Sequence, residues 1–169
     1  MSNTQESVVY RLPTALDGAA VFKLVEQCPP LDTNSMYCNL LQSSHFSSTS
    51  VAVDFQGQLA GFISGYIVPE RPDCLFVWQV AVNDKVRGKG VATGMLKAIL
   101  ARPQCDAVRY LETTITASNR ASWALFEGLA AKCQTELEQS LMFDRDEHLG
   151  GEHDSEQLVR IGPFEKTDI

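Results

Sequence analysis

Apolar residues along the chain follow two periods, one typical of strands and the other typical of helices. Apolar and β-rich runs predict strands at residues 8–12, 50–55, 59–66, 75–82, 108–114, 137–143 and 158–161. Apolar residues that recur every three or four positions predict four helices. The first follows a cap at Thr14 or Asp17 and runs to about Gln27, the second spans 33–44, the third 91–101, and the fourth follows a cap at Ser118 or Asn119 and runs to about Lys132. In chain order the elements are therefore β-α-α-β-β-β-α-β-α-β-β, an α/β (α+β) pattern without internal repeats.

Turn-forming and helix-capping residues mark several boundaries between these elements. Cys28-Pro29-Pro30 is expected to end the first helix, because neither proline can donate a helical hydrogen bond. Asp32 is expected to cap the second helix. Gln56-Gly57 predicts a tight hairpin turn, and the acidic, glycine-containing segment 144–154 predicts a loop.

A glycine-rich turn joins the central strand to the helix at 91–101. Its sequence is Arg87-Gly88-Lys89-Gly90-Val91-Ala92. This order directs backbone N–H groups and a helix N-terminus at one spot, which favours binding of an anion. The two glycines let a phosphate approach the backbone, and Arg87 and Lys89 add positive charge. The turn is not a P-loop, because no Gly-Lys-Ser/Thr is present.

Length and composition predict one globular domain over residues 1–169, with flexible tails at 1–7 and 165–169. Hydrophobic residues make up 44% of the chain and charged residues 21%. The net charge of −7 argues against nucleic acid as a partner. No apolar run reaches the ~18 residues of a membrane helix, and residues 1–7 lack the features of a secretory signal. We therefore expect a cytoplasmic protein that does not bind membranes.

The cysteines and histidines give weak chemical signals. The five cysteines are odd in number and form no Cys-x-x-Cys, so they are interpreted as reduced thiols rather than as disulfides. His148 and His153 are separated by a spacing that matches no recurrent metal-ligand pattern. We expect no metal.

The strand followed by the Arg87–Ala92 turn resembles motif A of the GNAT N-acetyltransferases, in which Arg/Gln-x-x-Gly-x-Gly/Ala cradles the pyrophosphate of coenzyme A. The element order is also that of the GNAT fold, which implies a mixed, mostly antiparallel central sheet flanked by helices. The resemblance implies acetyl-CoA as cosubstrate. It assigns cofactor binding to the backbone of the strand and turn and to a helix-start asparagine: Val80, Val82, Arg87, Gly88, Lys89, Gly90, Val91, Ala92 and Asn119.

A more specific resemblance, over about residues 8 to 164, is to the family of L-2,4-diaminobutyrate acetyltransferases, which act in ectoine synthesis. It is carried by unusual strings in this sequence, namely Cys28-Pro29-Pro30-Leu31-Asp32-Thr33-Asn34-Ser35-x-Tyr37, Leu41-Gln42, His45-Phe46, Phe76-Val77-Trp78-Gln79-Val80-Ala81-Val82, Leu111-Glu112-Thr113-Thr114-Ile115-Thr116, Asn119-x-Ala121-Ser122-Trp123 and Arg160-Ile161-Gly162-Pro163-Phe164. The implied reaction is acetylation of the γ-amine by direct attack on the thioester, and the family is expected to be homodimeric.

This second resemblance implies where the diamine binds and which groups act on it. The substrate-binding residues would be Asp32, Tyr37, Trp78, Glu112 and His153. Glu112 would also accept the ammonium proton, and the backbone N–H of Val80 would polarise the thioester carbonyl. Several of these residues also have a simpler interpretation: Asp32 and Asn119 as helix caps, Glu112 as a solvated charge at a strand end, and Trp78, Val80 and Val82 as core residues of the strand.

One position departs from the superfamily pattern, because Phe126 lies where many members have the tyrosine that protonates the coenzyme A thiolate. Another group or water would supply this proton, and Tyr37 is a candidate. No partner for the substrate carboxylate is evident, with Arg71, Arg109 and Arg120 as open candidates. Two alternative functions stay open at this point: acetylation of another small diamine such as ornithine, lysine or a polyamine, and non-catalytic binding of acyl-CoA.

Overall fold

The computed structural model describes residues 7–169. The predictions of a flexible tail and of no secretory signal over residues 1–7 therefore lie outside the described residues, except at Ser7. The chain divides into two compact units. Unit 1 extends to Tyr66 and resumes over Gln79–Gln104, and unit 2 comprises Ile67–Trp78 and Cys105–Ile169. The prediction of a single domain over residues 1–169 stays a prediction.

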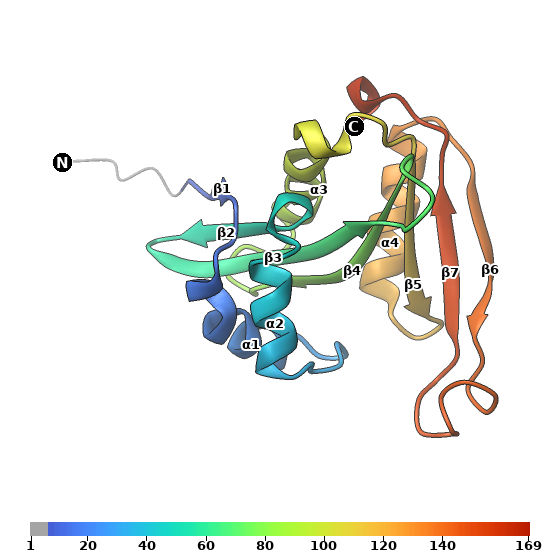
Figure 1. Ribbon diagram of the computed structural model, residues 1–169, viewed down its shortest axis with the longest axis horizontal. Coiled ribbons are helices and arrows are strands. Elements are labelled where there is room, and N and C mark those ends of the chain that lie inside the picture. The colour runs from blue at the N-terminus through green and yellow to red at the C-terminus, as the bar shows by residue number, and fades with distance from the viewer. Residues whose placement is uncertain (1–6) are drawn as a thin grey trace. The chain divides into compact units, whose positions relative to one another are not determined.

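Unit 1 contains an antiparallel group of strands and three helices (Figure 1). Its strands are β1 (Val9–Arg11), β2 (Val51–Phe55) and β3 (Gln58–Ile67), which pair in that order. Its helices are α1 (Gly18–Glu26), α2 (Met36–Ser43) and α3 (Val91–Leu100). Gln56 and Gly57 join β2 to β3 with φ values of 52° and 76°, a turn whose twist matches that of the two strands.

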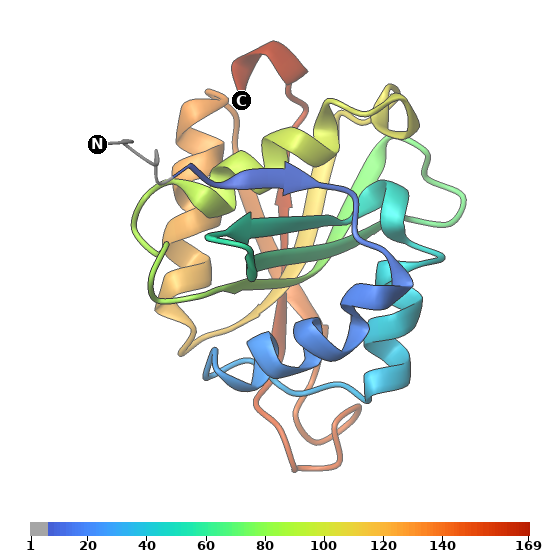
Figure 2. The same ribbon diagram turned by 90° about the vertical axis from the view of Figure 1, so that its left-hand side faces the viewer.

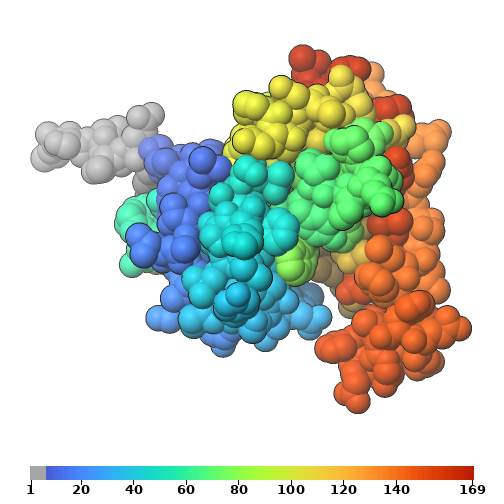
Figure 3. Space-filling view, viewed as in Figure 1, coloured from blue at the N-terminus to red at the C-terminus, as the bar shows by residue number. Residues whose placement is uncertain are grey.

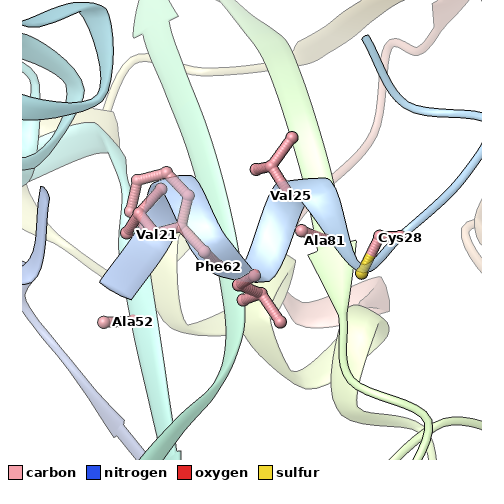
Figure 4. Packing of buried hydrophobic residues seen from close by; sticks show 7 residues of the cluster. Val21, Val25, Cys28, Ala52, Phe62 and Ala81 are labelled. Carbon is pink, nitrogen blue, oxygen red and sulfur yellow. The ribbon is translucent and has the colours of Figure 1, made fainter. Parts of the chain in front are cut away.

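The core of unit 1 lies between α1 and the strands. Val21 and Val25 of α1 form a buried cluster with Phe62 of β3, and Ala52, Ala81 and Cys28 belong to it as well (Figure 4). Leu24 of α1 belongs to the same cluster. The spacing of Val21, Leu24, Val25 and Cys28 puts these side chains on one face of the helix. Burial of this apolar face therefore holds the first helix against the strands.

Unit 2 is built on strands β4 (Cys74–Val82), β5 (Tyr110–Thr116), β7 (Glu156–Ile161) and β6 (Leu137–Phe143), paired in this spatial order. β4 gives its first five residues to this unit and its last four to unit 1. β4 and β5 are parallel, whereas β5–β7 and β7–β6 are antiparallel. Helix α4 (Arg120–Lys132) lies along one face of these strands in both views (Figures 1 and 2).

The predicted fold class and element order are confirmed by this seven-stranded mixed sheet flanked by helices. The largest difference concerns the second helix, because α2 begins at Met36 rather than at Thr33. Asp32 does not cap it: the side chain of Ser35 accepts the hydrogen bond from the backbone N–H of Cys38, at 3.1 Å. Asp32, Thr33, Asn34 and Ser35 are all residue types that favour a cap, so local propensity could not choose among them.

Candidate functional site

The glycine turn of unit 1 has the geometry of an anion cradle. Gly88 and Gly90 both have φ near +75°, a conformation that side-chain-bearing residues rarely adopt. A Cβ built on either glycine would meet nothing within 4 Å, so the space beside the backbone is open. Gly90 precedes α3, and no side chain caps that helix. The N–H groups of its first turn are therefore free of side-chain partners, and a phosphate matches them in size and charge.

The two basic residues of this turn differ in how firmly they are held. The guanidinium of Arg87 donates to the carbonyl of Val82 at 3.0 Å and pairs with Asp84 at 2.8 Å. The ammonium of Lys89 lies 5.7 Å from the ring centroid of Phe55. Arg87 thus ties the turn to the end of β4, while Lys89 is exposed and available to a ligand.

Val80 and Val82 lie on the partly exposed side of β4 and alternate with the buried Gln79 and Ala81. Their side chains are half-buried, which agrees with both of the roles considered for them: packing by the side chain and binding through the backbone. The carbonyl of Val82 also accepts a hydrogen bond from the thiol of Cys28, at 3.4 Å. This contact fixes the end of α1 to the strand that leads into the glycine turn.

Gln79 positions the segment that carries Asp32, a role that the sequence did not reveal. Its side chain is buried in β4, donates to the backbone carbonyl of Asp32 at 3.0 Å and accepts from the amide of Asn34 at 3.4 Å. Asp32 itself is exposed, and Tyr37 is 69% exposed in the first turn of α2. The structure therefore brings Asp32 beside the last part of β4 and leaves the Tyr37 ring open to solvent.

In unit 2, four residues of the central strands share one face. Phe76 is paired with Glu112, and Glu112 is paired with Arg160, so these three side chains point to the same side of the sheet. Trp78, two residues after Phe76, lies on that side as well and is 41% exposed. The structure thus places Trp78 and Glu112, both predicted to bind the diamine, on the same face of the sheet, with Trp78 partly exposed and Glu112 buried.

Glu112 is held by two arginines that the sequence analysis did not connect to it. Arg71 donates to both carboxylate oxygens, at 2.7 and 2.9 Å, and Arg160 donates to one of them, at 2.5 Å. Burial alone would raise the pKa of Glu112, but the hydrogen bonds from Arg71 and Arg160 outweigh it and leave the pKa below its ordinary value. A carboxylate held in this way binds a proton weakly, so its geometry favours a positioning role over that of a base.

Asn119 directly precedes helix α4 and Phe126 lies within it, and both have structural roles. The side chain of Asn119 caps the helix by accepting from the N–H of Ser122 at 3.2 Å. The indole N–H of Trp123 donates to the carbonyl of Thr116, at 3.1 Å, and fixes the helix start to the end of β5. Phe126 is 1% exposed and belongs to the core. The contact of Asn119 with coenzyme A stays a prediction.

His153 lies in the loop between β6 and β7, which the space-filling view shows as an exposed orange-red lobe (Figure 3). The loop is ordered by its own contacts. One oxygen of the Asp144 side chain accepts from the N–H groups of Asp146 and Glu147, and the N–H of Asp144 donates to Nδ1 of His148. His153 is exposed, and its role in substrate binding stays a prediction.

The cysteines of the described chain are all free, and four of the five are buried. Burial and the charge of Glu112 raise the pKa of Cys74 to about 11, so this thiol is a poor nucleophile. Residues 7–169 contain no group of three or more histidine, cysteine or acidic side chains placed to hold a metal ion. None of the helices described is long and apolar enough to cross a membrane.

The model of the acetyltransferase (GNAT) family matches residues 19–130, and the chain belongs to this family. The match includes the glycine turn and both ends of β4. The resemblance predicted from the sequence is thus confirmed at the level of the superfamily, and the chain is an acetyltransferase.

Within this family, the chain is similar to L-2,4-diaminobutyric acid acetyltransferases, which confirms the more specific resemblance predicted from the sequence. It is 60% identical to that of Methylotuvimicrobium alcaliphilum, over 90% of this chain and 88% of the relative. It is 47% identical to that of Chromohalobacter salexigens, over 100% of this chain and 88% of the relative. The solved diaminobutyrate acetyltransferase of Paenibacillus lautus, in complex with its substrate L-2,4-diaminobutyric acid and coenzyme A, matches with a TM-score of 0.90 and 38% identity, covering 95% of this chain and 97% of that one.

Proposed function

We propose that this enzyme transfers the acetyl group of acetyl-CoA to the γ-amine of L-2,4-diaminobutyrate, giving N-γ-acetyl-diaminobutyrate in ectoine biosynthesis. The observation that carries the proposal is the similarity, over nearly the whole of both chains, to the Paenibacillus lautus enzyme with its diamine and coenzyme A. In this reaction an N–C bond forms and the thioester C–S bond breaks. The nitrogen loses two protons, one when the ammonium is deprotonated and one after its attack on the carbonyl. The leaving coenzyme A thiolate takes up one proton, and the other is released to solvent.

The acetyl-CoA side of the proposal rests on the turn before α3. The N–H groups of the turn and of the first helical residues, Gly88 to Ala92, would bind the pyrophosphate, and the exposed Lys89 would add an ion pair. The backbone of Val80 and Val82 would hold the pantetheine arm, with the N–H of Val80 donating to the thioester carbonyl. Asn119 would contact the cofactor from the start of α4. The open space beside Gly88 and Gly90 supports the first of these assignments.

The diamine side of the proposal rests on charge and aromatic surface. Diaminobutyrate carries two ammonium groups and one carboxylate at neutral pH. The exposed carboxylate of Asp32, the Tyr37 ring and the partly exposed Trp78 are groups that attract ammonium ions. His153 completes the groups proposed to contact the diamine, and Glu112 contributes to the site by holding Arg71 and Arg160. The γ-ammonium has a pKa near ~10, so its deprotonation by a base or by desolvation must be part of the reaction.

We also propose a cytoplasmic homodimer. The supporting feature is β6, which lies at the end of the strand order and exposes Leu141, Met142 and Phe143 by 55%, 40% and 39%. An exposed apolar edge strand favours pairing with another chain. Light scattering should give twice the chain mass, and Leu141→Lys should shift it toward the monomer. Leu16→Lys is the control, because Leu16 is 95% exposed on unit 1; equal masses for all three proteins would contradict the proposed interface.

The function is tested by coenzyme A release from acetyl-CoA with purified protein and a panel of L-2,4-diaminobutyrate, ornithine, lysine and putrescine, with NMR of each product. We expect turnover confined to diaminobutyrate and acetylation at the γ-nitrogen. Comparable turnover of several diamines would leave the GNAT chemistry and overturn the substrate assignment. Binding of acetyl-CoA without turnover of any diamine would favour the non-catalytic alternative.

A further inference from the structure

Unit 2 contains a cluster of three charged side chains whose arrangement the transfer reaction itself does not explain. Arg71, Glu112 and Arg160 form one cluster, in which two guanidinium groups share a single carboxylate. The Glu112 side chain is 4% exposed, whereas those of Arg71 and Arg160 are 46% and 28% exposed. The negative charge therefore lies underneath and the two positive charges face outward.

Both arginines are held in place before any ligand binds. The backbone of Arg71 is fixed in the turn between β3 and β4, where its N–H donates to Val68 and its carbonyl accepts from Cys74. The guanidinium of Arg160 is 3.9 Å from the ring centroid of Tyr110, which orients its plane. Two such preorganised groups lose little side-chain entropy on binding an anion.

The cluster retains unused capacity to donate hydrogen bonds. A guanidinium has five N–H donors. Arg71 gives two bonds to Glu112 and Arg160 gives one, and within residues 7–169 the side chain of Glu112 is their only hydrogen-bonding acceptor. The charge of Asp73 also acts on Arg71 and offsets part of its positive potential. An anion with two oxygens can accept hydrogen bonds from several of the remaining donors.

The same face of the sheet carries Trp78, which the proposed function places against the diamine. Diaminobutyrate has one anionic group, its carboxylate, and a chain with a net charge of −7 offers few places that attract it. We propose that Arg71 and Arg160 bind the substrate's α-carboxylate, and that Glu112 is a positioning residue that holds both guanidinium groups. This inference rests on the proposed function, since it names the subsite that selects an amino acid over a simple diamine.

The test compares two probes that differ in the carboxylate. L-2-Aminobutyrate keeps the carboxylate and lacks the γ-amine, while 1,3-diaminopropane keeps both amines and lacks the carboxylate. Each is measured as an inhibitor of diaminobutyrate acetylation in the wild type and in Arg71→Gln. We expect the inhibition constant of L-2-aminobutyrate to rise about 10- to 100-fold, as for loss of a charge-assisted hydrogen-bonded pair, and that of 1,3-diaminopropane to stay within about threefold.

Arg109→Gln is the matched control, because Arg109 is an arginine of the same unit with a 42% exposed side chain. Within residues 7–169 its guanidinium donates to the carbonyls of Asp106 and Val108 and lies 4.0 Å from Glu165. It should change neither constant. Because both probes are measured on the same variant, partial unfolding lowers the active fraction without changing their ratio. Equal changes for the two probes in Arg71→Gln would overturn the inference.

Glu112→Gln separates positioning from proton transfer. A positioning role predicts a higher KM for diaminobutyrate with kcat reduced by less than about tenfold, whereas removal of a general base would lower kcat by about 100-fold or more. The latter result would overturn the positioning role. Absence of diaminobutyrate turnover in the wild type would instead refute the proposed function, so the two failures are distinguishable.

Discussion

At the turn proposed to bind the pyrophosphate of acetyl-CoA, the backbone conformation decides which type of residue each position can hold. Gly88 and Gly90 are required by a positive φ rather than by crowding, because a Cβ would find open space. The same argument applies to Gly57 in the hairpin turn, with φ of 76° and no neighbour within 4 Å. Gly90 in the proposed cofactor cradle and Gly57 outside it therefore form a matched pair for comparison.

Gly90→Ala should weaken acetyl-CoA binding by about tenfold and cost about 1 kcal/mol of folding free energy, because the left-handed conformation disfavours alanine. Gly57→Ala should cost a similar free energy of unfolding and leave acetyl-CoA affinity unchanged. Calorimetric titration and urea unfolding measure the two quantities. Loss of cofactor affinity in both variants would show that general strain, not the cradle, is responsible.

The sequence could predict this cradle because all of its residues are consecutive. It could not predict the partners of Glu112, since Arg71 lies 41 positions before it and Arg160 lies 48 positions after it. Only the pairing of β4, β5 and β7 brings them together. The burial of Gln79 and its bonds to the Asp32 segment were missed for the same reason. Local patterns carry no information about such long-range contacts.

At the scale of elements, helices α2, α3 and α4 each begin directly after a residue with a capping side chain or after a glycine. α2 begins after Ser35 and α4 after Asn119, both with a side-chain cap, whereas α3 begins after Gly90 with none. The strands and the order of the helices were predicted closely, because their apolar periods are strong. The start of α2 was predicted three residues early, because the tertiary bonds from Gln79 hold residues 32–34 outside the helix.

Asn119→Ala should destabilise the protein by about 1 kcal/mol through loss of the α4 cap. Asn119→Ser should restore most of this stability, because serine also caps well. If the amide of Asn119 also contacts coenzyme A, the serine variant will recover thermal stability without recovering the KM for acetyl-CoA. Unchanged melting temperature in the alanine variant would contradict the capping role.

For the molecule as a whole, two buried or nearly buried carboxylates make the stability of the fold depend on pH in the acidic range. Hydrogen bonds from Arg11 lower the pKa of Asp17, while the arginine pair more than offsets the effect of burial on Glu112. A lowered pKa in the folded state contributes stability at a pH above the ordinary carboxyl value, and this stability is lost as the pH falls through the folded value. Both groups therefore stabilise the fold at neutral pH and cease to do so in acid.

Glu112→Gln should be about 1–3 kcal/mol less stable than the wild type at pH 7, and the difference should shrink between about pH 5 and pH 3. Urea unfolding across this range measures it. Glu165→Gln is the control, because Glu165 is 72% exposed and lies 4.0 Å from Arg109. Its free energy of unfolding should stay close to that of the wild type across this pH range. A difference between wild type and Glu112→Gln that stays constant down to pH 3 would contradict the assigned role of the ionised carboxylate.

The depth of Glu112 below its two arginines also decides how the molecule responds to salt. At 1 M ionic strength the screening length falls to about 3 Å, and pairs in open solvent such as Arg145 and Asp154, 3.8 Å apart, lose most of their attraction. A carboxylate that is 4% exposed is out of reach of mobile counter-ions. The arrangement of charges beneath the proposed substrate face should therefore persist in concentrated electrolyte, where most of the surface pairs of this acidic chain would not.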